Sequence, residues 1–77
     1  MITYWHHKFW KAMGLYLSYN EEMNEVWYHR RDLQCSGLFP ETIRGIKSMG
    51  CHQISAEEAD AIWPHGHALH NNWTIDE

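Results

Sequence analysis

A row of apolar residues at helical spacing constrains the first half of this chain more than any other feature. Between residues 2 and 33, ten positions follow one another in alternating steps of three and four, and nine of the ten are apolar. They are Ile2, Trp5, Phe9, Ala12, Tyr16, Tyr19, Met23, Val26, Arg30 and Leu33. Apolar residues at this spacing lie on one face of an α-helix. The pattern therefore predicts a helical N-terminal half whose apolar face packs against something else.

Capping signals place the ends of the expected helices. Ser18 followed by Glu21 has the pattern of a capping box, and Ser55 with Glu58 repeats it near the C-terminus. Pro40 suits the first turn of a further helix. We therefore predict a mainly α fold of about four helices, at residues 4–13, 18–35, 40–49 and 55–63.

A β-hairpin is the alternative for part of the same segment. Residues 15–19 carry Leu, Leu and Tyr at alternate positions, and residues 25–30 include Val, Trp and Tyr, which favour strands. Residues 20–24 would then form the hairpin loop, because Asn24 tolerates the left-handed conformation that such loops require. This alternative is an α+β fold in which the hairpin packs on the two C-terminal helices.

Length limits the chain to one small domain, residues 1–77, in which residues 64–77 are expected to form an irregular tail. A domain of this size buries only about 60 % of the surface that its unfolded chain exposes, so support from a partner is expected. The sequence has neither a leader pattern nor an apolar run of about 18 residues. We therefore expect a cytoplasmic protein with free thiols and no contact with a membrane.

Aromatic content gives the main functional hypothesis. Five Trp, four Tyr and two Phe make 14 % of the chain, and such rings are concentrated in protein interfaces. Trp10, Trp27 and Tyr28 lie off the main apolar row, so we predict that they contact a partner through an aromatic-rich helical surface. The expected protein is a protein-binding module: an accessory subunit, or a small inhibitor or regulator of a larger assembly, of the kind that mobile genetic elements encode. A second copy of the chain is the simplest partner.

Basic residues form a second expected contact set, suited to an anionic patch on the partner: Arg30, Arg31, Arg44 and Lys47. The net charge of −4 has the wrong sign for a typical nucleic-acid-binding protein. Residues 40–63 could still form a helix-turn-helix, which makes DNA binding the third hypothesis. Acidic residues in the second of those helices would be repelled by phosphates, so we do not favour it.

Histidines and cysteines support an alternative of another class, a metal-binding regulator. Imidazole and thiolate groups suit zinc, copper or nickel. The candidate ligands are Cys51, His52, His65, His67 and His70. Their spacing matches neither C-x-x-C nor H-E-x-x-H, and the chain has no nucleophile elbow or phosphate-binding loop. We therefore expect no bound cofactor and no enzymatic activity.

Overall fold

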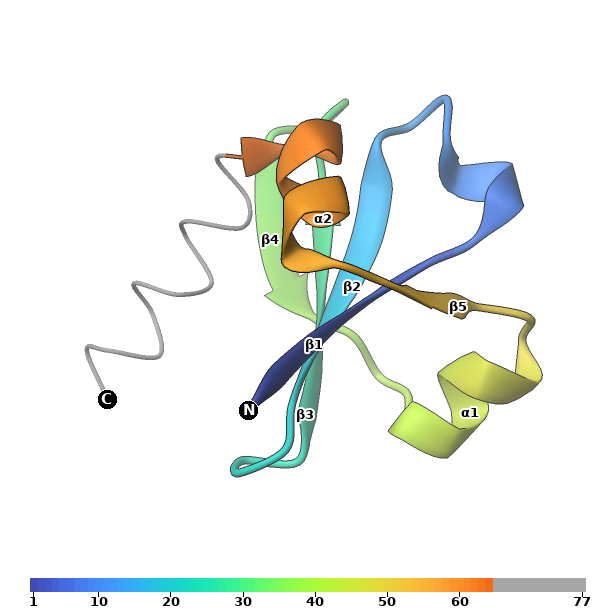
Figure 1. Ribbon diagram of the computed structural model, residues 1–77, viewed down its shortest axis with the longest axis vertical. Helices are drawn as coiled ribbons and strands as arrows, with labels where there is room; N and C mark the ends of the chain where they lie inside the picture. The colour runs from blue at the N-terminus through green and yellow to red at the C-terminus, as the bar shows by residue number, and fades with distance from the viewer. Residues whose placement is uncertain (65–77) are drawn as a thin grey trace.

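The computed structural model describes residues 1–64, which form an antiparallel five-stranded sheet with two short helices (Figure 1). In chain order the elements are β1 (Ile2–His6), the 3-10 helix η1 (Lys8–Trp10), β2 (Leu15–Asn20), β3 (Glu25–Arg30), β4 (Cys35–Leu38), α1 (Ile43–Ser48), β5 (His52–Ile54) and α2 (Ala56–Ile62). The strands lie in the order β4-β3-β2-β1-β5, so β2 is the central strand and β4 and β5 are the edges.

The predicted mainly α fold of four helices is wrong in the N-terminal half. The segments 4–13 and 18–35 lie largely in strands and turns, and η1 is the one helical segment within them. The reason is that both faces of the sheet are covered. Apolar side chains then occur on both sides of a strand, and steps of three and four residues no longer distinguish a helix from a strand.

The α+β alternative is closer to the structure. β2 and β3 form the hairpin expected at 15–19 and 25–30, and Asn24 in its turn has a φ of 54°. The alternative did not include β1, β4 or β5. The two C-terminal helices are present but short, and α2 begins with the predicted capping box of Ser55 and Glu58, in which both hydrogen bonds form.

The core has two parts, one on each face of the sheet. Under α2 lies the first cluster, Tyr4, Tyr16, Ile54, Ala59 and Trp63. On the face covered by α1 lies the second cluster, Trp5, Leu17, Val26, Ile46 and Cys51. We call these faces the α2 face and the α1 face. The neighbours Tyr16 and Leu17 in β2 are both 0 % exposed, although they point to opposite faces.

Buried polar side chains join the strands on the α2 face. The predicted N-cap Ser18 lies inside β2, where its hydroxyl is 2.8 Å from Nε2 of His29. Nδ1 of the same ring is 2.8 Å from the hydroxyl of Ser36 in β4. A neutral imidazole has one donor and one acceptor nitrogen, and a hydroxyl can act as either, so both contacts can form together. The Tyr16 hydroxyl donates to the carbonyl of Trp63 at 3.1 Å, and burial raises its pKa well above the usual value.

The core assignment is tested by two leucine substitutions of identical chemistry. Leu17→Ala removes a fully buried side chain from the second cluster and should lower the free energy of unfolding by about 2–5 kcal/mol. Leu33→Ala removes a side chain that is 60 % exposed and should change it by no more than about 0.5 kcal/mol. Urea unfolding of both variants measures the difference. Equal losses would show that Leu17 does not lie in the core.

Candidate functional site

The predicted aromatic contact residues do not form one surface. Trp10 and Tyr28 are half-buried and pack against the second cluster on the α1 face. Tyr28 also lies over the adjacent strand, where a Cβ atom at Gly37 would be 3.0 Å from its ring. Trp27 lies on the α2 face, and its indole N–H donates to Glu25 at 3.3 Å. The helical surface that was expected to present these rings is absent, because Trp10 lies in η1 and the other two lie in β3.

Among the Phe, Trp and Tyr rings of residues 1–64, the most exposed is that of Phe9, a member of the predicted apolar row. Its side chain is 74 % exposed, and Met49, at the end of α1, is 43 % exposed. Between them lies His7, whose ring centroid is 5.0 Å from that of Phe9 and 5.4 Å from that of Trp10. These four residues, His7, Phe9, Trp10 and Met49, form what we call the Phe9 patch.

Hydrogen bonds through His7 hold the Phe9 patch together. The backbone N–H of Phe9 donates to Nδ1 of His7 at 3.2 Å. Nδ1 therefore carries no proton, and Nε2, 3.1 Å from the Met49 carbonyl, is the nitrogen that donates. The backbone N–H of Trp10 also donates to the His7 carbonyl at 2.9 Å. The single imidazole thus joins η1 to the end of α1, which lies 42 residues away in the sequence.

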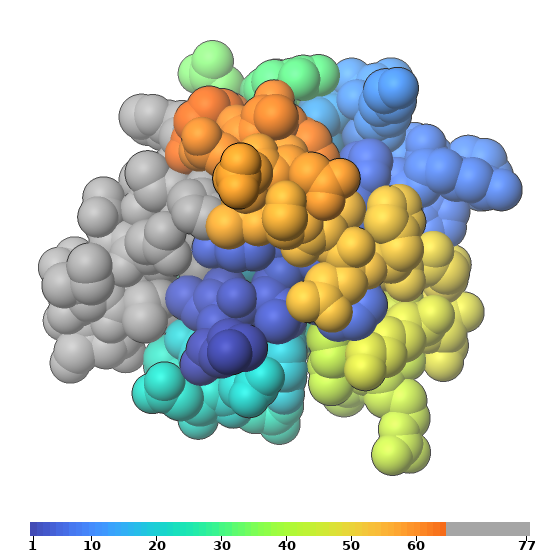
Figure 2. All heavy atoms as spheres, in the orientation of Figure 1, coloured from blue at the N-terminus to red at the C-terminus, as the bar shows by residue number. Residues whose placement is uncertain are grey.

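One cation lies over the ring of the Phe9 patch and two more lie on α1, whereas most exposed carboxylates of the described residues lie elsewhere. The Lys8 ammonium lies 5.2 Å from the centroid of the Phe9 ring. α1 adds the exposed cations Arg44 and Lys47, the latter 5.5 Å from the Trp5 ring centroid. Figure 2 shows the segments around η1 and α1 next to each other at the right of the molecule. Exposed carboxylates are found on α2 and in the turn between β2 and β3: Glu21, Glu22, Glu57, Glu58 and Asp60.

The four predicted basic contact residues are divided between two ends of the molecule. Arg30 forms an ion pair with Asp32 at 2.7 Å, and this contact holds the pKa of the Asp32 carboxyl below its usual value. Arg31 follows Arg30 in the chain and lies in the turn between β3 and β4. Arg44 and Lys47 lie on α1, away from that turn (Figure 1). The structure thus separates the two pairs, and only the second lies beside the Phe9 patch.

Of the predicted metal ligands, the structure describes Cys51 and His52. Cys51 is buried in the second cluster, and burial raises the pKa of its thiol. His52 is exposed on β5, with its ring 5.9 Å from that of His6. Within residues 1–64, no three His, Cys, Asp or Glu side chains are grouped to hold a metal ion. The other predicted ligands, His65, His67 and His70, lie outside the described residues, as does nearly all of the expected tail at 64–77.

The helix-turn-helix considered as the third alternative for residues 40–63 does not form. β5 lies between α1 and α2 in the sequence, and the two helices cover opposite faces of the sheet. Neither helix can therefore support the other as a recognition helix in the way that this motif requires.

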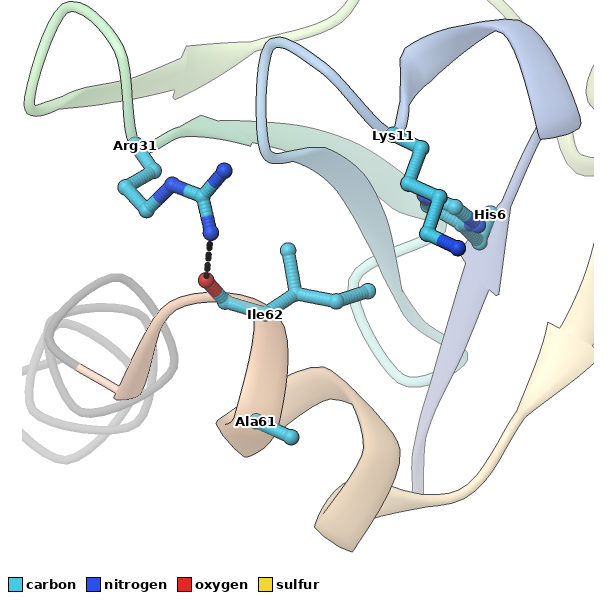
Figure 3. Close-up of a pocket in the computed structure, with 5 residues that line it drawn as sticks. All are labelled: His6, Lys11, Arg31, Ala61 and Ile62. Atoms are coloured by element: carbon cyan, nitrogen blue, oxygen red, sulfur yellow. Dashed lines mark hydrogen bonds between the residues drawn. The ribbon is translucent and has the colours of Figure 1, made fainter.

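A cavity of about 540 Å³ lies at the end of β1, beside the end of α2. Its described lining comes from β1, the loop after η1, the turn between β3 and β4, and the end of α2: His6, Lys11, Arg31, Ala61 and Ile62. Figure 3 shows the Ile62 side chain directed between Arg31 on one side and His6 with Lys11 on the other. No local sequence signal identifies this cavity, because four separate segments contribute to it.

Comparisons with known proteins add no assignment to this geometry. No family model, curated protein or solved structure matches the chain. Within the described residues, neither α1 nor α2 has the length and apolar character needed to cross a bilayer.

The environment of His6 predicts a dependence of stability on pH. Burial lowers the pKa of His6, and His52, His7 and Lys11 lower it further. The unfolded chain therefore binds this proton more readily than the folded one. The stability contributed by neutral His6 is complete above the unfolded-state pKa of about 6.5 and is lost as the pH falls through the folded-state pKa.

We therefore expect His6→Gln to lose less unfolding free energy than the wild type between about pH 8 and about pH 5. Urea unfolding at a series of pH values measures both curves. If the two curves run parallel over this range, proton binding at His6 does not contribute to the acid sensitivity of the fold.

Proposed function

We propose that this chain is a non-enzymatic protein-binding module, acting as an accessory subunit or as a small inhibitor or regulator of a larger assembly, and that it binds through the Phe9 patch. The observation that carries the proposal is the 74 % exposure of the Phe9 ring, which His7 links to the exposed Met49. Burying apolar surface contributes about 25 cal/mol per Å². A chain with a small core that leaves a large ring in water is suited to bury that ring against a partner.

The fixed position of Phe9 supports the same proposal. Its backbone is tied to His7, and His7 is tied to α1 through Met49. Association costs free energy whenever a side chain or segment must be ordered on binding. A ring presented by a short hydrogen-bonded turn needs less ordering than a ring on a free loop, so more of the apolar contact contributes to affinity.

The charges around the patch define the chemistry of the partner. Lys8 lies over the Phe9 ring, and α1, which ends at Met49, carries the exposed Arg44 and Lys47. Glu41, the carboxylate before α1, accepts a hydrogen bond from the Thr42 backbone N–H. An interface of this kind suits a protein with an apolar recess bordered by Asp or Glu side chains, because complementary charges speed association and select the partner. The partner in this proposal is therefore another protein with an acidic rim.

Substituting the exposed ring tests this proposal. Phe9→Ala should leave the melting temperature close to that of the wild type, because the ring contributes little to the core. It should weaken binding to the partner by about 2 kcal/mol or more, which is about thirtyfold in Kd. The partner is first recovered with the wild-type chain from its source and identified by mass spectrometry, and the purified pair is then titrated by calorimetry.

The matched control is Leu33→Ala, which removes another exposed apolar side chain outside the patch. The control should bind like the wild type. Equal affinity of Phe9→Ala and the wild type would exclude the patch as the contact surface. Arg30 and Arg31 would then be the next candidate contact residues. Sedimentation over a range of concentrations distinguishes a second copy of the chain from a different protein.

A further inference from the structure

The cavity at the end of β1 has an unbalanced positive lining. Three of its five described lining residues, His6, Lys11 and Arg31, carry nitrogen atoms that are or can become positively charged. None of the five is acidic, and the ion pairs found among the described residues involve neither Lys11 nor Arg31. Cations brought together without a carboxylate favour an anion from outside the chain.

His6 contributes a buried polar atom at this end of β1. Its Nε2 atom is buried and has no hydrogen-bond partner among the described residues. Buried polar atoms are nearly always hydrogen-bonded, since leaving one without a partner costs free energy. Burial lowers the pKa of His6, and the neighbouring His52, His7 and Lys11 lower it further. An anion bound in the cavity would supply the opposite charge.

Arg31 is held at the cavity by contacts that leave most of its donors available. Its Nη1 donates to the carbonyl of Ile62 at 3.3 Å, where an arginine interacts favourably with the end of α2. The side chain passes close to Gly14, at which a Cβ atom would lie 2.7 Å from Cβ and Nε of Arg31. Backbone N–H groups of the same turn donate to the carbonyls of Gly14 and Met13, both at 3.1 Å. A guanidinium has five N–H donors, so a single bond to Ile62 leaves others for a ligand.

We infer that this cavity binds a small anionic molecule with an apolar body. Its carboxylate or phosphate group lies beside Lys11, and its apolar part lies against Ala61 and Ile62, while Arg31 adds positive charge from the other side of Ile62. The volume of about 540 Å³ is that of a small-molecule site rather than of a cavity for a single ion. This site lies apart from the Phe9 patch, and it does not depend on the proposed protein partner.

Titration of the full chain with simple probes tests the site. Benzoate and phenyl phosphate each combine an anionic group with an apolar ring, benzamide lacks the charge, and inorganic phosphate lacks the ring. We expect saturable changes in the amide resonances of Ala61 and Ile62 with benzoate or phenyl phosphate, and the stronger of the two identifies the anionic group. Benzamide should give none, and inorganic phosphate should bind at least about tenfold more weakly than phenyl phosphate.

Two lysine variants make the test specific. Lys11→Met removes a cation from the cavity lining, and because Lys11 is exposed the fold should be kept, as an otherwise unchanged amide spectrum would show. The Kd of the better probe should rise about tenfold or more. Lys8→Met removes the same charge from a position over the Phe9 ring, outside the cavity, and should leave this Kd unchanged. The inference is overturned if neither anion saturates, if benzamide or inorganic phosphate binds as well as phenyl phosphate, or if both variants lose affinity equally.

Discussion

The structure depends on β2, the strand that is enclosed on all sides. Hydrogen bonds join it to β1 and β3, and its two faces carry the centres of the two core clusters, with Tyr16 beneath α2 and Leu17 on the α1 face. A small domain has few residues that can be fully buried, and here neighbouring residues of one strand serve both halves of the core. Both helices are therefore held by the same short segment, since Ala59 packs with Tyr16 and Ile46 packs with Leu17.

This double burial also decides how much of the fold the sequence could predict. Where local chemistry determined the outcome, the predictions hold: Asn24 has the expected left-handed turn conformation, and Ser55 with Glu58 forms the expected capping box. The apolar spacing predicted a helix wrongly, because Tyr16 and Tyr19 fit one helical row but lie on opposite faces of β2. Ser18 was predicted to be an N-cap, but its hydroxyl forms a hydrogen bond with His29 inside the sheet. Only the tertiary structure can settle such a competition.

The candidate sites were harder to predict for the same reason. Phe9 belongs to the apolar row by position, but it lies in η1, where its ring is exposed to solvent. The ring contacts with His7 and the hydrogen bond from His7 to Met49 join residues that are far apart in the sequence, so no local motif records them. Trp10 and Tyr28, which the sequence predicts to contact a partner, lie half-buried at the margin of the second cluster.

The end of β1 connects the two proposed sites through two adjacent histidines. Successive residues of a strand point in opposite directions. His6 accordingly faces the cavity beside α2, whereas His7 leaves the strand toward α1 and holds the Phe9 patch. Gly50 has a φ of 97° and a Cβ atom there would lie 3.4 Å from Nε2 of His7, so the chain between α1 and β5 approaches this imidazole closely. One strand end therefore positions both the proposed anion-binding cavity and the proposed contact surface, on separate sides of a small domain.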